Sequence, residues 1–376
     1  MVWSCLNYFN SANWVVPIVK VAVDSHRNTL YTLNEKSQID VIYLGPEGKD
    51  FEKIKSNYDV LASLSRYGEY VGTEGAAPKI VSIHVIDPSE SSDVHLIAVT
   101  KTGTRIYMTN TTTSSMYPSH YAGSPNTATK PDTLSVMFQR PAPFSLQTQS
   151  SAPINVHQSF YHFGLTVFAS IMNAETDTLV AVNLDAGTIV NKNTYLEVTS
   201  SIVAEGTCWG IAESGFDGAW RETLNELSTQ ISQPQRKIVV LTSTGVAIYK
   251  KKRPVDLLQQ FLSDANGNAT EELRRFFEHY GQKESCAMCL AIACGHPNIS
   301  SQKVAVTMSP KFSNPIIANS AKKFFFEIGG KPTLKNNNST IPFLWILFNR
   351  ISLWANGGPQ PRCQSFRTIR RPHVVL

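Results

Sequence analysis

Apolar and polar residues alternate in four pairs of short runs between residues 14 and 252. In each pair an apolar run is followed by a small polar turn and a second apolar run. Alternation with a period of two residues is typical of half-buried strands, and Gly103, Gly187 and Gly245 stand where a hairpin turn needs positive φ. The pattern predicts four β-hairpins, TLYTLNEKSQIDVIYLG (29–45), HLIAVTKTGTRIYMT (95–109), TLVAVNLDAGTIV (178–190) and KIVVLTSTGVAIYKK (237–251).

The spacing of these hairpins favours a β-propeller. Successive hairpins begin about 60 to 85 residues apart, whereas a common propeller blade takes roughly 40–45 residues. The additional residues in each repeat are consistent with insertions between strands. Residues 110–132 have the composition of a loop, and residues 213–235 that of an excursion with a short helix. An isolated hairpin is marginally stable, so these units must stack on one another. A β-sandwich is the alternative, but its turns should recur without such long gaps.

From Pro254 onward the apolar period changes to that of helices. The run RPVDLLQQFL puts Pro254 at a first helical position and places Leu257, Leu258 and Phe261 on one face. The run NATEELRRFFEHYG predicts a second helix that ends at Gly281, and a third follows it. Short consecutive helices favour the start of an α-solenoid. We therefore expect the junction between propeller and solenoid at Pro254, Leu257, Leu258 and Phe261.

Three parts follow from these patterns. Residues 1–252 are expected to form the C-terminal blades of a β-propeller, residues 253–330 the first helices of an α-solenoid, and residues 331–376 an unstructured basic tail. The tail carries seven Lys or Arg residues and no Asp or Glu. Because the whole chain has a formal net charge of +5, the first 330 residues carry −2. A nucleic-acid partner is not expected, since it would require a basic face on a folded domain.

The cysteines of the third predicted helix raise the question of a zinc site. Cys286, Cys289 and Cys294 lie close together, with His279 and His296 nearby. A second Cys-x2-Cys pair, which a strong zinc signal requires, is absent from the sequence. The helix is apolar nearly all round, and unoxidised cysteine packs as a small hydrophobic residue. We expect three buried structural cysteines, no metal and no cofactor.

One further segment has amphipathic character. Over residues 50–72, Phe51, Ile54, Tyr58, Leu61 and Leu64 would share one face of a helix. Such a helix could lie on a membrane through its apolar stripe. The alternative is a helix docked on its own propeller, since one-sided apolar stripes usually face a core. These five residues are the candidate membrane contacts.

The sequence offers little catalytic chemistry. Asp24-Ser25-His26 has the residue types of a hydrolase triad, but neighbouring side chains along a strand end point apart, so a turn is expected. A glycine-rich phosphate loop is also missing from the sequence. No catalytic residues are predicted, and the chain is not expected to be an enzyme.

Several stretches together resemble a known family. The run KKRPVDLLQQFL, followed by EELRRFFEHYGQKESCAMCLAIAC, resembles the propeller–solenoid junction of the large inner-ring scaffold nucleoporins, the 155- and 170-kilodalton class of the nuclear pore complex. Upstream, VKVAVDSHRNTLYTLNEKSQIDVIYLG, HLIAVTKTGTRIYMT and PDTLSVMFQRPAPF resemble that family in order and spacing. The resemblance covers about residues 14–335. It implies the later blades of a propeller whose earlier blades precede this chain, and it leaves the tail after residue 335 unmatched.

The resemblance also implies a role. Proteins of this class are structural subunits that support nucleocytoplasmic transport, including protein and mRNA transport, at the nuclear envelope. Their implied partners are linker and inner-ring nucleoporins, pore-membrane proteins and the curved nuclear membrane, which a loop at the place of residues 50–72 can touch. Two alternatives remain from the sequence: a vesicle-coat subunit with the same propeller-then-solenoid order, and a propeller enzyme with a zinc-bearing helical appendage.

Overall fold

The computed structural model describes residues 16–66, 79–112, 130–143, 154–192, 196–215, 226–231, 233–265, 268–295, 315–328, 333–335 and 338–340. The chain divides into two compact units. The first comprises Met1–Ser228 and Gln235–Lys252, and the second comprises Thr229–Pro234 and Arg253–Leu376.

Over its described residues, the first unit consists of four antiparallel sheets whose strands are adjacent in chain order. The first sheet contains β1 (Ile18–Asp24), β2 (Thr29–Asn34), β3 (Gln38–Tyr43) and β4 (Glu52–Asp59). The second contains β5 (Ile80–Val85), β6 (Leu96–Thr100), β7 (Arg105–Thr109) and β8 (Ser135–Arg140). The third contains β9 (Val156–His162), β10 (Leu165–Ile171), β11 (Asp177–Leu184) and β12 (Glu197–Ala204). The fourth has three strands, β13 (Cys208–Ser214), β14 (Lys237–Thr242) and β15 (Gly245–Lys250).

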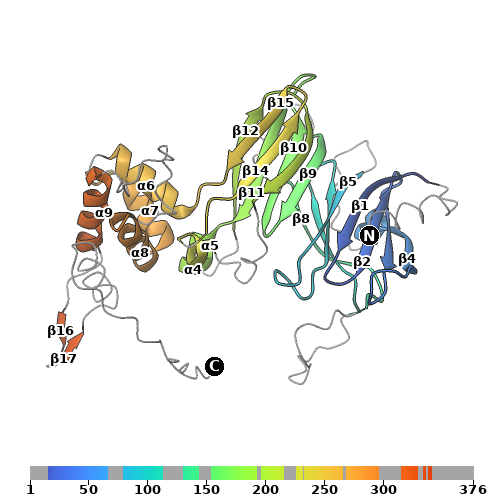
Figure 1. Ribbon diagram of the computed structural model, residues 1–376, viewed down its shortest axis with the longest axis horizontal. Helices are drawn as coiled ribbons and strands as arrows, with labels where there is room; N and C mark the ends of the chain where they lie inside the picture. The colour runs from blue at the N-terminus through green and yellow to red at the C-terminus, as the bar shows by residue number, and fades with distance from the viewer. Residues whose placement is uncertain are drawn as a thin grey trace. The chain divides into compact units, whose positions relative to one another are not determined.

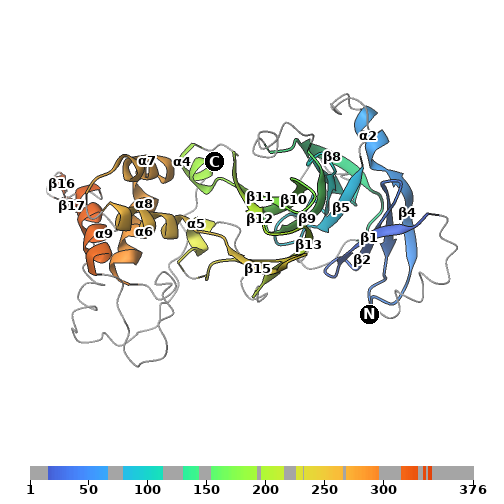
Figure 2. The same cartoon turned by 90° about the horizontal axis from the view of Figure 1, so that it is seen from above.

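These sheets are stacked as the blades of a propeller (Figures 1 and 2). The first strand of each sheet contacts the first strand of the next, from β1 to β5, β5 to β9 and β9 to β13. The predicted β-propeller is therefore confirmed. The short helices α2 (Val60–Arg66), α4 (Ala186–Lys192) and α5 (Glu226–Thr229) lie in the connections between strands.

Apolar cores fill the space between successive blades. Each core takes side chains from the facing sides of two adjacent sheets, as the alternation of apolar and polar residues along each strand requires. The core between the first and second blades includes Tyr31, Leu33, Ile83 and Leu96. The core between the second and third blades includes Ile97, Val99, Phe168 and Val180. The core between the third and fourth blades includes Val167, Leu179, Ile238 and Val240.

Two sequence predictions are wrong in this unit. The predicted hairpin over residues 178–190 has a strand only in its first half, because α4 follows β11. The Asp185 carboxylate accepts hydrogen bonds from the backbone N–H groups of Gly187 (3.0 Å) and Thr188 (3.4 Å), and so caps this helix. The helix predicted over residues 50–72 is a strand, β4, up to Asp59, and among the described residues only 60–66 are helical.

The second unit contains α6 (Pro254–Asp264), α7 (Glu271–Tyr280), α8 (Gln282–Ala293) and α9 (Pro315–Ile328). Pro254 begins α6, the Thr270 side chain caps α7, and Gly281 ends α7 with a φ of 82°. These helices enclose an apolar core that includes Leu258, Phe276, Cys289 and Phe324. A short hairpin of β16 (Thr333–Lys335) and β17 (Asn338–Thr340) lies within the tail that the sequence predicts to be unstructured.

Candidate functional site

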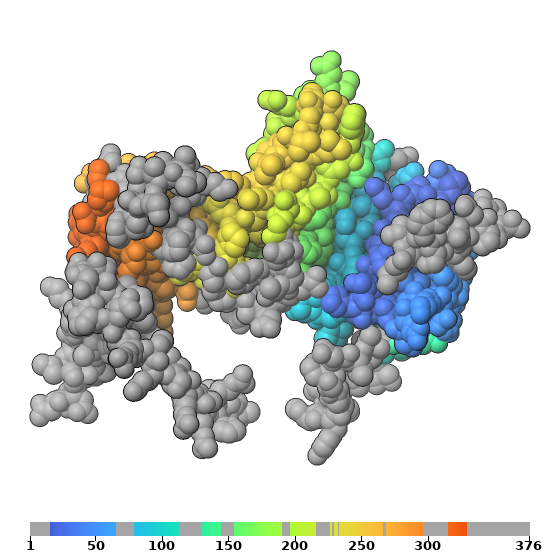
Figure 3. Space-filling view, viewed as in Figure 1, coloured from blue at the N-terminus to red at the C-terminus, as the bar shows by residue number. Residues whose placement is uncertain are grey.

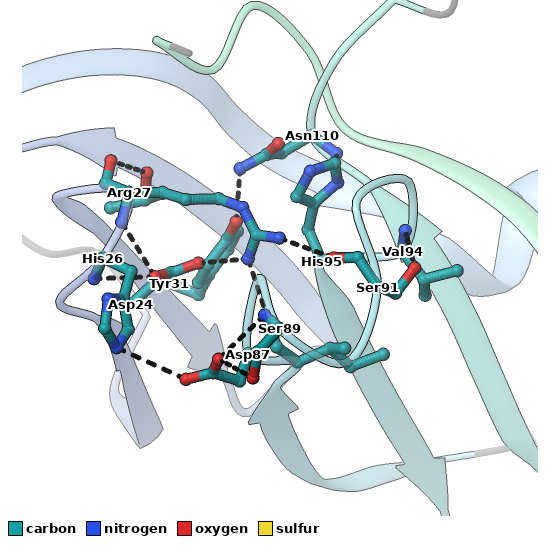
Figure 4. Close-up of polar contacts among 12 residues, drawn as sticks. Asp24, His26, Arg27, Tyr31, Asp87, Ser89, Ser91, Val94, His95 and Asn110 are labelled. Atoms are coloured by element: carbon teal, nitrogen blue, oxygen red, sulfur yellow. Dashed lines mark hydrogen bonds and ion pairs between the residues drawn. The ribbon is translucent and has the colours of Figure 1, made fainter. Parts of the chain in front are cut away.

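A buried ion pair holds the joint between the first and second blades. Arg27, only 5% exposed, follows β1 and contacts the Asp24 carboxylate at 2.8 Å. Its guanidinium also donates to the carbonyl oxygens of Ile86 (2.8 Å) and Ser91 (2.9 Å) on the second blade (Figure 4). The Asp24 carboxylate accepts from the backbone N–H groups of His26 and Arg27 as well. Asp24-Ser25-His26 is thus a turn at a strand end, as expected. The Asp24 carboxylate is occupied by the Arg27 guanidinium and by backbone N–H groups.

A second polar cluster lies beside this ion pair (Figure 4). The Asn110 side chain donates to the Tyr31 hydroxyl at 2.6 Å, and the Asn110 backbone N–H donates to Nδ1 of His95 at 3.1 Å. Burial lowers the pKa of His95 to about 4, so its imidazole is neutral at pH 7. A neutral ring that accepts at Nδ1 carries its proton on Nε2. These groups bind one another, as in a buried structural network.

Charged side chains also link the second blade to the third and the third blade to the fourth. The Glu90 carboxylate of the second blade accepts from the backbone N–H of Gly164 at 3.0 Å, in the turn between β9 and β10, and from the hydroxyl of Tyr161 on β9. Arg236, before β14, donates to the carbonyl oxygen of His162 at 2.8 Å and pairs with Glu213 at 2.7 Å. At each joint, one charged side chain binds the backbone of a turn in the neighbouring blade.

A serine–histidine cluster lies between β5 and β9. Nε2 of His84 is 2.8 Å from the Ser159 hydroxyl and 3.2 Å from the Ser82 hydroxyl. Burial, with a smaller contribution from Lys20, lowers the pKa of His84 to about 4. Within the described part of the chain, no carboxylate binds the other ring nitrogen of His84. The cluster therefore lacks the third member that orients the base in a hydrolase triad.

The five candidate membrane contacts pack against protein. Leu64 is buried, and Ile54, Tyr58 and Leu61 pack against the core between the first two blades. Phe51 packs against a smaller cluster of Leu30, Ile42 and Leu44. This placement favours the docked alternative. No helix in the described ranges is both long enough and apolar enough to cross a membrane.

The residues predicted at the junction contribute to the helical core. Pro254 and Leu258 are buried, and Leu257 and Phe261 are partly buried against the same core.

The three clustered cysteines belong to this core as well. Cys286 and Cys289 are fully buried, and Cys294 is half-buried. Burial raises the pKa of Cys286 to about 11 and raises that of Cys289 further. A raised pKa disfavours the thiolate that a metal requires. The described residues contain no group of three or more His, Cys, Asp or Glu side chains that could hold a metal ion.

The fourth blade presents an open apolar surface. Its outermost strand, β15, exposes Val246 (64%) and Ile248 (62%), and the adjacent Leu241 and Trp209 are exposed too. Figure 3 shows these strands, in yellow, at the surface. Gly210 stands opposite Leu241, and a side chain at Gly210 would meet nothing within 4 Å. Sequence reasoning missed this surface because the alternation of β14 and β15 predicts a covered sheet.

Comparisons with known proteins agree with the fold. The family described as Nucleoporin_N, Nup133 N terminal like, matches residues 2–248. The probable nucleoporin C890.06 of Schizosaccharomyces pombe is 25% identical over an alignment that covers 96% of this chain and 31% of that protein. The nuclear pore complex protein Nup154 of Drosophila melanogaster is 26% identical, over 78% of this chain and 22% of that protein. The chain thus spans less than a third of the length of these relatives.

A solved structure extends the likeness to three dimensions. The crystal structure of the Chaetomium thermophilum Nup170 NTD–Nup53 complex matches 86% of this chain and 47% of the solved chain, with a TM-score of 0.66 and 25% identity. The chain belongs to the Nup133 N-terminal-like nucleoporin family, and it is a large scaffold nucleoporin of the nuclear pore complex in the nuclear envelope.

Proposed function

We propose that this chain is a non-enzymatic structural subunit of the inner ring, where it supports nucleocytoplasmic transport by binding a linker nucleoporin. The observation that carries the proposal is the likeness to the Nup170 N-terminal domain, which was crystallised with Nup53. The relatives are structural nucleoporins, which fits a role without catalysis. The polar clusters agree with this role, because their charged groups bind neighbouring backbone.

Co-purification tests the proposal. The full chain, carrying an affinity tag, is expressed in cells and isolated from nuclear envelopes, and its partners are quantified by mass spectrometry. We expect a linker nucleoporin of the Nup53 kind and other inner-ring subunits to be enriched over an unrelated tagged propeller. Enrichment of vesicle-coat subunits in their place would overturn the proposal.

Anchoring at the membrane is a separate proposal that follows from the resemblance alone. Because the apolar side chains at residues 51–64 pack inward, direct lipid contact would require α2 to leave its core. Contact through pore-membrane proteins would leave α2 packed in its core. Flotation of the full chain with small liposomes separates the two routes, since only the direct route predicts that the chain floats without a partner.

A further inference from the structure

The polar contacts at the joints form one continuous network of bonds across the four blades. Arg27 of the first blade holds the loop between β5 and β6 through the carbonyl oxygens of Ile86 (2.8 Å) and Ser91 (2.9 Å). Glu90, the residue before Ser91 in that loop, accepts from the backbone N–H of Gly164 in the third blade at 3.0 Å. One short loop of the second blade is therefore bound by the blades on both of its sides.

The turn between β9 and β10 is shared in the same way. Glu90 binds it from the second blade, and Arg236 of the fourth blade donates to the carbonyl oxygens of His162 (2.8 Å) and Phe163 (3.1 Å). The contacts thus continue from the first blade to the fourth. The members of this joint network, in order, are Asp24, Arg27, the loop 86–91 with Glu90, the turn 162–164, Arg236 and Glu213.

The loop 86–91 is stiffened by its own hydrogen bonds. The carbonyl oxygen of Asp87 accepts from the backbone N–H groups of Glu90 (2.9 Å) and Ser91 (3.1 Å). The Asp87 carboxylate also accepts from the backbone N–H and the hydroxyl of Ser89 (Figure 4). Because Glu90 and Ser91 share one acceptor, a displacement of one of them moves the other. The loop therefore transmits a displacement between its two bound residues.

The turn 162–164 is strained. Phe163 has a φ of 41° and Gly164 a φ of 71°. Positive φ costs little for glycine, but it is a strained conformation for a bulky residue such as phenylalanine, and such strain persists only where the surroundings hold it. Relaxation of Phe163 to a negative φ would turn its neighbouring peptide groups. The carbonyl oxygens that Arg236 binds and the N–H that Glu90 binds belong to these groups, so both contacts would be lost together.

We propose that the joint network couples the first blade to the fourth, with the strained turn 162–164 as the element that has two arrangements. Coupling through contiguous groups requires such an element. Loss of the bonds from Arg236 lets the turn relax, which releases Glu90 and, through the loop 86–91, loosens the hold on Arg27. A partner that displaces this turn would therefore also loosen the first blade. This coupling is a property of the propeller and does not depend on the proposed function.

Hydrogen exchange of the purified full chain tests the coupling. The readout is exchange at residues 26–27, whose backbone N–H groups bind the Asp24 carboxylate in the first blade. Arg236→Met, in the fourth blade, should accelerate exchange there by about threefold or more. Glu90→Met removes the middle link at similar side-chain length. Adding Arg236→Met to Glu90→Met should therefore cause no further acceleration at residues 26–27.

Arg105→Met is the matched control. Arg105 is a buried arginine that also joins the second blade to the third, through Glu197 at 2.8 Å, but it is not a member of the joint network. Its loss should leave relative exchange at residues 26–27 unchanged. Exchange in β10 is the internal reference in every variant, because a general loss of stability accelerates exchange in core strands as well.

Three outcomes would overturn the coupling. These are unchanged relative exchange at residues 26–27 in Arg236→Met, an equal acceleration when Glu90 is already replaced, and an equal acceleration in Arg105→Met. If Arg236→Met does not fold, Arg236→Lys keeps the charge without the forked donor group and is judged by the same outcomes.

Discussion

Single charged residues fix the position of each blade against the next. Arg27 is the clearest case, since it binds one carboxylate on its own blade and two carbonyl oxygens on the neighbouring blade. Removing one member of a buried ion pair leaves the other charge without compensation. The energetic role of Arg27 is therefore larger than that of a surface ion pair.

Arg27→Met should lower the free energy of unfolding by about 3–5 kcal/mol, because the Asp24 carboxylate stays buried without its cation. Urea denaturation followed by circular dichroism measures the change. The double variant Asp24→Asn/Arg27→Met should be less destabilised than Arg27→Met alone. A loss below about 1 kcal/mol, typical of exposed pairs, would contradict this account.

His95 should make stability depend on pH. Its pKa is about 4 in the folded chain, below the ordinary value of 6.5, because burial disfavours the charged ring. A lowered folded pKa means that the stabilising contribution is complete above pH 6.5 and is lost as the pH falls toward 4. Burial lowers the pKa of His84 to about 4 as well, so His95→Gln should flatten this part of the stability profile only in part. An NMR titration of the His95 ring with a midpoint at its ordinary value would contradict the prediction.

At the scale of elements, the period of the sequence predicts strands and helices where one face is buried. The hairpins at β2–β3, β6–β7 and β14–β15 follow from alternation, and α6 and α7 follow from their apolar stripes and end signals. The helix predicted in place of β4 is wrong. Residues four apart, such as Ile54 and Tyr58, lie on the same side of a strand as well as of a helix, so their spacing does not distinguish the two. Asn57, with a φ of 49°, lies at an irregularity in the pairing of β3 with β4, which a sequence pattern does not reveal.

Substitution of a cysteine in α8 and treatment with a chelator test whether these cysteines pack in the helical core or bind a metal. Cys289→Ala should lower the free energy of unfolding by about 1–2 kcal/mol, as expected for a modest truncation in a core. A chelator should leave the melting temperature of the full chain unchanged, whereas a structural zinc would make the helices unfold on chelation. Finding one zinc per chain by elemental analysis would overturn the packing interpretation.

At the scale of the whole molecule, the chain crosses between its two units more than once. The segment Thr229–Pro234 belongs to the second unit, although the strands before and after it belong to the first. Arg253, also in the second unit, binds this segment through the carbonyl oxygens of Gln230 (2.8 Å) and Gln233 (2.6 Å). The helices are therefore tied to the segment 229–234 by side-chain bonds, in addition to their covalent link at Lys252.

A single cut after residues 250–252 should not release the helices. After limited trypsin digestion, the two fragments should run separately on a denaturing gel but elute together from a size-exclusion column. Arg253→Met should weaken this association, because it removes the bonds to Gln230 and Gln233. Separate elution of the fragments of the unmodified chain would show that the segment does not hold them.

The open apolar surface of the fourth blade could not be predicted from the sequence. Residues 237–251 have the pattern of an ordinary hairpin, and the exposure of Leu241, Val246 and Ile248 depends on what packs on the face of the sheet that points away from the third blade. Val198 and Ile202 are likewise apolar residues of a regular strand, and their exposure depends on what packs on that blade among the residues that the structure describes. The joints were missed for the same reason, since Arg27 and Glu90 have no distinguishing local pattern.

The way Arg27 and Arg236 hold neighbouring turns has a consequence for divergence between relatives. Both side chains bind carbonyl oxygens, which every amino acid supplies, so these contacts do not depend on the side chains of the receiving residues. The arginines themselves have no such freedom. Substitution scanning should therefore find Ser91 more tolerant of replacement than either arginine, whereas Ile86 is also constrained by its place in the core between the second and third blades and His162 by its contact with Glu213.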